Sequence, residues 1–133
     1  MEFNSYGDEF LGKLVPFDFG TLEFFPVRSF IVFDSKKGVV RGNHAHLKCR
    51  QLLVCVKGEI LLNFINSEGE FQKTLKEGDF FLLENMVWCS QQFLTGNDIL
   101  KVFCDLPYTR EDYIENKDQF IKITEFIKQF IEI

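Results

Sequence analysis

The chain has 133 residues, of which 15 are Lys or Arg and 20 are Asp or Glu, so its net charge is −5. A surplus of negative charge argues against a partner held through many phosphates, and we expect no binding to nucleic acid. A hydrophobic fraction of 46% in a chain of this length is enough for one domain with one core, and it excludes a disordered chain.

All the apolar segments of the chain are short. Charged or turn-forming residues interrupt each of them before the length of about 20 residues that crosses a bilayer, so we expect no membrane partner. The first residues, 1–5, lack the basic start and apolar core of a secretory signal. The four cysteines form no C-x-x-C pair and are expected to be reduced thiols. Together these features predict a cytoplasmic protein.

Strands are predicted for most of the chain between residues 21 and 105. Short apolar runs alternate there with turn sequences rich in Gly, Asn, Ser and Lys, a pattern typical of antiparallel sandwiches and barrels. About eight strands are expected. They fall at residues 22–25, 27–33, 52–56, 60–65, 71–75, 80–83, 87–93 and 99–104.

The two ends of the chain depart from this pattern. Residues 1–25 hold more apolar side chains than a small barrel buries by itself: Phe17, Phe19, Leu22, Phe24 and Phe25. In residues 111–131 the apolar side chains recur at steps of three and four, which predicts a helix with one apolar face. We expect this helix to cover an end of the barrel or to dock on a second subunit, and to carry no chemistry. No linker or repeat indicates a second domain, so residues 1–133 are expected to form one.

The two histidines of the chain, His44 and His46, lie two positions apart. Residues at this spacing on a strand point to the same face, and Gln51, beyond the following bend, can return toward them. Gly42 lets the backbone or a ligand approach closely, and Arg41 adds a permanent positive charge. Such a cluster, in a chain with no other histidine, favours a functional site over a structural role.

This stretch resembles the first motif of the cupin superfamily. The motif is matched at Gly38, His44, His46 and Gly58. Gln51 stands where cupins have a glutamate ligand, and Cys89 replaces the histidine of the second motif. The resemblance implies an all-β fold, a cupin-type antiparallel β-barrel (jelly roll) with a C-terminal helix.

The two replaced ligands bear on metal binding. A neutral amide oxygen is a poor ligand for Fe, Mn or Zn, so we expect no metal and no other cofactor. A zinc site made of His44, His46 and Cys89, with one open position, stays an alternative.

A more specific resemblance covers most of the chain. It is carried by Phe33-Asp34, Arg41-Gly42-Asn43-His44-Ala45-His46, the strand from Gln51 to Gly58, Val87-Trp88, Tyr108 and Asp112-Tyr113-Ile114. These stretches are similar to the nucleotide-sugar 3,4-ketoisomerases, the WxcM-like cupins. The resemblance implies metal-independent conversion of a dTDP-4-keto-6-deoxyhexose to its 3-keto isomer, a step of deoxyamino-sugar biosynthesis. It also implies a homodimer whose N-terminal strands, in residues 1–25, exchange between subunits.

The resemblance further implies a role for individual residues. His44 is the base that removes the C3 proton, which the adjacent carbonyl acidifies, and His46 shuttles a proton between the two oxygens. Arg41 stabilises a developing oxyanion or binds a phosphate oxygen. Substrate contacts are expected from Arg28 to the diphosphate, Gln51 to a sugar hydroxyl, Trp88 to the thymine or a sugar face, and Cys89.

Two departures from the family pattern limit these expectations. Phe30 and Ile31 occupy a place where members often have Tyr, and Cys89 stands where they have His. The epimer formed at C4 therefore does not follow from the sequence. Three other functions stay open: a dTDP-sugar 3,5-epimerase, a non-catalytic sugar-binding cupin and a metal-dependent cupin enzyme.

Overall fold

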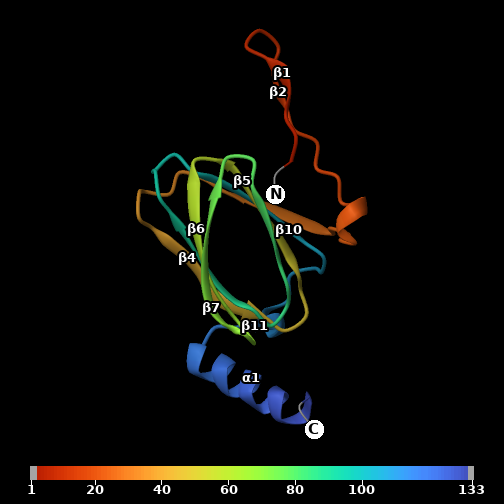
Figure 1. Cartoon of the computed structure of the whole chain (residues 1–133), viewed down its shortest axis with the longest axis vertical. Coiled ribbons are helices and arrows are strands. Elements are labelled where there is room, and N and C mark those ends of the chain that lie inside the picture. The colour runs from red at the N-terminus through yellow and green to blue at the C-terminus, as the bar shows by residue number, and fades with distance from the viewer. Residues whose placement is uncertain (1–2, 132–133) are drawn as a thin grey trace.

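The structure is a computed structural model, and it describes residues 3–131. Strands make up most of the chain, and one α-helix follows them (Figure 1). In chain order the elements are β1 (Tyr6–Asp8), β2 (Gly12–Leu14), the 3-10 helix η1 (Gly20–Leu22), β3 (Arg28–Val32), β4 (Val40–His46), β5 (Gln51–Lys57), β6 (Glu59–Asn66), β7 (Gly69–Lys76), β8 (Phe80–Leu83), β9 (Trp88–Phe93), β10 (Ile99–Cys104), the 3-10 helix η2 (Arg110–Asp112), β11 (Tyr113–Ile114) and α1 (Lys117–Ile131).

Two antiparallel sheets form the body of the molecule. One has four strands in the order β3-β10-β5-β8, and the other has five in the order β11-β4-β9-β6-β7. Figure 1 shows the two sheets facing each other across an interior, with α1 at one end and the β1–β2 hairpin standing away from the other. Because side chains alternate between the faces of a strand, each sheet turns one set inward. The predicted all-β class with a C-terminal helix is confirmed.

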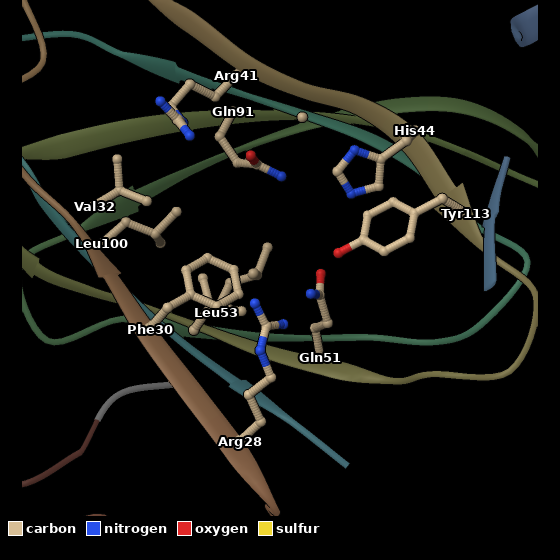
Figure 2. Close-up of a pocket in the computed structure, with 12 residues that line it drawn as sticks. Arg28, Phe30, Val32, Arg41, His44, Gln51, Leu53, Gln91, Leu100 and Tyr113 are labelled. Atoms are coloured by element: carbon tan, nitrogen blue, oxygen red, sulfur yellow. The ribbon is translucent and has the colours of Figure 1, made fainter. Parts of the chain in front are cut away.

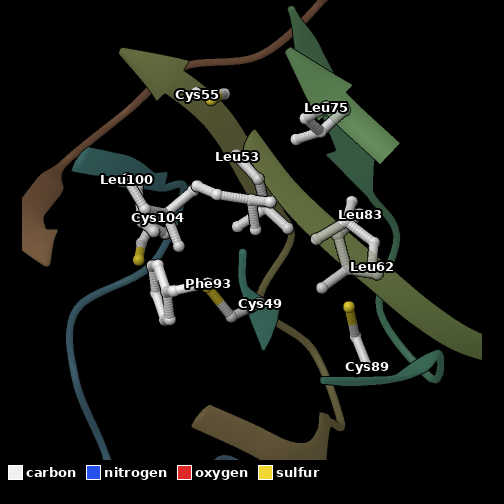
Figure 3. Packing of buried hydrophobic residues seen from close by; sticks show 12 residues of the cluster. Cys49, Leu53, Cys55, Leu62, Leu75, Leu83, Cys89, Phe93, Leu100 and Cys104 are labelled. Atoms are coloured by element: carbon white, nitrogen blue, oxygen red, sulfur yellow. The ribbon is translucent and has the colours of Figure 1, made fainter. Parts of the chain in front are cut away.

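The core lies between the sheets, as Figure 3 shows. It includes Leu53 from β5, Leu62 from β6 and Leu100 from β10, each at most 2% exposed. Burial of one such side chain stabilises the fold by about 1.5–3 kcal/mol. All four cysteines also belong to this core and are free thiols.

The N-terminal phenylalanines form a second apolar cluster on the four-stranded sheet. Phe24 is fully buried there against Leu52 and Phe103, with Phe17 and Phe19 packed around them. The strand predicted at 22–25 is wrong, because η1 ends at Leu22 and the left-handed backbone of residue 23 (φ 50°) reverses the chain. Much of the apolar segment is therefore buried within this chain.

The helix α1 begins later than predicted. Residues 110–112 form a 3-10 turn, and Tyr113–Ile114 pair with β4 as a short strand. The Asn116 side chain then accepts a hydrogen bond from the backbone N–H of residue 119 (2.9 Å) and caps the helix. Phe120 anchors α1 against Trp88 on the outer face of the five-stranded sheet. Between residues 3 and 131, no helix has the length and apolar character that spanning a membrane requires.

Candidate active site

A β-bulge in β4 sets the direction of the two histidines. The pairing of β4 with β9 shifts between Gly42 and His44, where Gly42 (φ 87°) and Asn43 (φ 61°) both have left-handed backbones. A Cβ atom on Gly42 would lie 2.9 Å from the backbone oxygen of Cys89, so only glycine fits. The extra residue bends the strand and changes the direction in which the side chains of His44 and His46 point.

His44 lies on the wall of a cavity of about 290 Å³ between the sheets (Figure 2). The polar side chains on this wall are Arg28, Arg41, His44, Gln51, Gln91 and Tyr113. They come from β3 and β5 of one sheet and from β4, β9 and β11 of the other. Apolar side chains such as Phe30 and Leu53 complete the wall. A cavity lined by apolar groups with a few convergent polar ones is typical of a small-molecule site.

The electrostatic setting of His44 suits a base. Burial lowers the pKa of His44 below its ordinary 6.5, and the neighbouring His46 lowers it further. The imidazole is therefore neutral at neutral pH and has a free lone pair. Its ring centroid lies 5.0 Å from that of His46 and 4.9 Å from that of Tyr113, so the three rings form one group.

His46 is held by a carboxylate. Its Nδ1 lies 2.9 Å from Oδ2 of Asp112. The same carboxylate accepts hydrogen bonds from two backbone N–H groups, that of Lys48 on Oδ1 (2.7 Å) and that of Cys49 on Oδ2 (3.3 Å). The carboxylate places the proton of His46 on Nδ1. Nε2 is buried and has no hydrogen-bond partner within the described chain. His46 lies behind the cavity wall, 4.4 Å from Tyr113 between ring centroids, and presents an acceptor nitrogen there.

The zinc site considered from the sequence does not form. In the described residues, the potential metal ligands that lie within 4.8 Å of one another are His46, Cys49 and Asp112, without Cys89. Hydrogen bonds from His46 and from the Cys49 backbone to Asp112 account for their proximity. Burial raises the pKa of Cys89 to about 12, so this side chain is a neutral thiol in the core.

Four of the predicted site residues do line the cavity: Arg28, Arg41, His44 and Gln51. Trp88 does not, because it faces the outer side of its sheet and packs on Phe120, with 5.8 Å between ring centroids. Cys89, its neighbour on β9, points into the core behind the wall. Trp88 and Cys89 thus pack within the fold and not on the cavity wall, and the substrate contacts expected of them stay predictions.

Sequence reasoning missed three polar residues of the site. Tyr113 and Gln91 line the cavity, and Figure 2 shows the Tyr113 hydroxyl directed into it. Burial raises the pKa of Tyr113, so it is a neutral hydrogen-bond donor. The resemblance includes Asp112 and Tyr113 only as members of the Asp112-Tyr113-Ile114 stretch and implies no role for either. Gln91 lies two residues after Cys89 on the same strand, so strand alternation could have indicated that both face the interior. The pairing of β11 with β4, which positions Asp112 and Tyr113, leaves no such pattern in the sequence.

Comparison with known proteins now identifies the family. The profile of the family described as FdtA: WxcM-like, C-terminal matches residues 1–125. The chain belongs to this family. A curated relative, the TDP-4-oxo-6-deoxy-alpha-D-glucose-3,4-oxoisomerase of Aneurinibacillus thermoaerophilus, is 29% identical over 96 residues, which are 71% of this chain and 69% of that one.

Solved structures of sugar 3,4-ketoisomerases have the same fold. The sugar 3,4-ketoisomerase QdtA of Thermoanaerobacterium thermosaccharolyticum, solved with TDP, superposes with a TM-score of 0.83 at 25% identity, covering 93% of this chain and 91% of its own. A 3,4-ketoisomerase of Helicobacter canadensis has a TM-score of 0.83 at 21% identity, covering 93% and 94%. The cupin-type fold expected from the two histidine motifs is thus confirmed.

Proposed function

We propose that this protein is an isomerase that converts a dTDP-4-keto-6-deoxyhexose into the 3-keto isomer, a step of deoxyamino-sugar biosynthesis. The observation that carries the proposal is the neutral His44 on the cavity wall, backed by the His46–Asp112 pair. The related 3,4-oxoisomerase of Aneurinibacillus thermoaerophilus and the TDP complex of QdtA support the same substrate class.

The reaction needs only proton transfers. The C4 carbonyl acidifies the proton on C3, and His44 removes it to give an enediol-like intermediate. The C4 oxygen gains a proton, the C3 hydroxyl loses one, and C4 receives the proton that completes the 3-keto product. C3 is oxidised and C4 is reduced within one molecule, so the step requires no external oxidant or reductant.

The other polar side chains fit particular parts of this reaction. His46, with its acceptor nitrogen beside His44 and Tyr113, relays protons between the two oxygens. The Tyr113 hydroxyl donates a hydrogen bond to an oxygen that becomes negative in the intermediate. Arg41, exposed at the rim of the cavity, binds the diphosphate or a developing oxyanion.

Proton exchange at C3 tests the proposal directly. Purified protein in deuterated buffer should exchange the C3 hydrogen of dTDP-4-keto-6-deoxyglucose and form a 3-keto product visible by NMR. A 3,5-epimerase would instead exchange the hydrogens at both C3 and C5 and retain the 4-keto group. A folded protein that binds the nucleotide sugar and exchanges nothing would contradict the proposal and favour a sugar-binding cupin.

We also propose that the single domain of residues 1–133 forms a homodimer by exchange of its N-terminal hairpin. The β1–β2 hairpin stands clear of the sheets (Figure 1), and its tip exposes Phe10 (94%) and Leu11 (79%). In addition, β3 is an edge strand with an exposed Ile31 on its outer side. Such an edge can pair with another chain.

The mass of the protein in solution tests the dimer. Light scattering should give twice the mass of one chain for the wild type and the mass of one chain for Phe10→Asp. A monomeric wild type would contradict the proposal.

A cytoplasmic location is part of the proposal. The four cysteines are all free and buried, as is usual for proteins of a reducing compartment. Fractionation of cells that express the tagged full chain would test it, because recovery with the periplasmic or membrane fraction would contradict the location.

A further inference from the structure

Three residues in adjacent strands form a row beneath the cavity. Cys104 at the end of β10 pairs with Arg28 on β3 and with Gln51 on β5. Directly paired residues of antiparallel strands project to the same face. Arg28 and Gln51 reach the cavity wall, whereas Cys104 is 1% exposed and lies between their inner ends.

The Cys104 sulfur is surrounded by hydrogen-bond donors. Nε2 of Gln51 lies 3.4 Å from it and Nη1 of Arg28 lies 3.8 Å from it. A guanidinium and an amide NH₂ can only donate, so the sulfur is the acceptor in both contacts. The Cys49 thiol lies near the same sulfur, and its hydrogen bond in the structure goes to the backbone oxygen of Arg50 (3.3 Å). A negative sulfur is the stronger acceptor for that single proton.

The charges around Cys104 favour its ionised form. On the strands packed against it, Arg28 on β3 is the nearest cation, and Tyr113 on β11 stays a neutral phenol because burial raises its pKa. The neighbouring Cys49 thiol as a donor outweighs burial and, with the contacts from Gln51 and Arg28, lowers the pKa of Cys104 to about 6.

Two further groups lie near the sulfur. The centroid of the Tyr108 ring is 5.4 Å from Cζ of Arg28. The Asp105 carboxylate forms an ion pair with Arg50, with 3.1 Å between Oδ2 and Nε. Cys55, in the same core, has the opposite shift: burial raises the pKa of its thiol to about 12.

We propose that Cys104 is a thiolate that positions Arg28 and Gln51 for the substrate. The sulfur holds the NH₂ of Gln51, so the amide oxygen faces the cavity, as Figure 2 shows, and can accept a hydrogen bond from a sugar hydroxyl. The same sulfur holds the Arg28 guanidinium at the cavity wall as an oriented donor. Cys104 itself does not line the cavity and is a positioning residue. This role deepens the proposed function and rests on it.

The first test measures the charge on the sulfur without any substrate. The ultraviolet absorbance that distinguishes a thiolate from a thiol is followed between about pH 5 and 8 in the wild type, Cys104→Ser and the matched control Cys55→Ala. The wild type and Cys55→Ala should each titrate one thiolate with a midpoint near pH 6, and Cys104→Ser none. Identical curves for the wild type and Cys104→Ser would overturn the proposal.

The second test measures positioning. Cys104→Ser should bind dTDP-glucose, which has no group that titrates in this range, about tenfold more weakly than Cys55→Ala, and should lose a similar factor in kcat/KM. Equal or tighter binding by Cys104→Ser would overturn the proposal, because the thiolate would then only offset the charge of Arg28. Binding of dTDP-glucose requires no turnover, so this result is separate from a failure of the isomerase assay.

A third variant covers the case in which Cys104→Ser does not fold. Cys49→Ala removes the S–H donor and keeps both sulfur contacts of Arg28 and Gln51. The midpoint of the thiolate titration should then rise above that of the wild type. An unchanged midpoint in this folded variant would contradict the assignment of the thiolate to Cys104.

Discussion

Replacement of Asp112 by Asn tests how His46 is oriented. In the structure, Oδ1 of Asp112 accepts the short hydrogen bond from the Lys48 backbone (2.7 Å), and Oδ2 accepts those from His46 Nδ1 (2.9 Å) and the Cys49 backbone (3.3 Å). The asparagine oxygen should keep the shortest of these bonds, to Lys48. Its NH₂ then faces His46 and donates to Nδ1, which forces the proton of His46 onto Nε2. The acceptor nitrogen beside His44 and Tyr113 is lost.

The size of the effect follows from these contacts. Two of the three hydrogen bonds to the carboxylate are lost or inverted, and each bond to a charged group contributes about 1.5–3 kcal/mol. Partial rearrangement of the loop leaves an expected loss of about 2–4 kcal/mol in the free energy of unfolding. The inverted tautomer should lower kcat by about 10²–10³-fold, because an imidazole with the wrong tautomer cannot relay the proton.

Asp105 provides a matched control. Its carboxylate also accepts a hydrogen bond from a loop backbone N–H, that of Arg50 (2.8 Å), but it contacts neither histidine. Asp105→Asn should lose stability to a similar extent and keep kcat within about threefold of the wild type. The assay compares kcat of the two variants, with nitrogen NMR of the histidine rings to report the tautomer. Equal kcat values for Asp112→Asn and Asp105→Asn would refute the role of Asp112.

Four other predictions concern the base, the pH profile and the packing. His44→Asn should lower kcat by about 10²–10⁴-fold, while calorimetry should show that it still binds dTDP-glucose. A variant that binds and also turns over at the wild-type rate would argue against a base at this position. Because the pKa of His44 in the free protein lies below 6.5, kcat/KM should be constant above neutrality and fall only in acid, with a midpoint below that value; a midpoint above it in stopped assays would be inconsistent. Trp88→Phe should lower the melting temperature, with a stability loss of about 1–2 kcal/mol, and leave KM unchanged, so a rise in KM would show substrate contact instead. Gly58→Ala should lose about 2–4 kcal/mol in urea unfolding, because residue 58 has φ 82° and a Cβ there would meet the Asp98 carboxylate; an unchanged midpoint would contradict this.

The function proposed for the cavity depends on the chemistry of its histidines. In a metal-dependent cupin, a glutamate and a third histidine would help to bind an ion. Here Gln51 offers only a neutral amide oxygen in place of the glutamate, and Cys89 is a neutral core thiol. The neutral His44 and the tautomer fixed by Asp112 instead suit proton transfer, which is the chemistry that a keto isomerisation requires.

Much of the strand arrangement was predictable because the chain alternates apolar and polar residues between well-marked turns. Seven of the expected strands are present, from β3 to β10 without β4, within a residue or two of their predicted bounds. The strand expected at 22–25 was wrong because an apolar run also suits a loop that packs on the outside of a sheet, as Phe24 does. Residues 111–116 were expected to be helical, but pairing with β4 made Tyr113 part of a strand.

The sequence by itself determined the fold class, the family and the pair of histidines, because these depend on local alternation and on a motif within one strand. Only the tertiary structure brought Asp112 to His46, turned Trp88 outward and placed Cys104 between Arg28 and Gln51. Each of these facts depends on which strands pair and in which register. Contacts between segments far apart in the chain leave no periodic signal in a single sequence, so the polar network around the histidines became visible only in the folded protein.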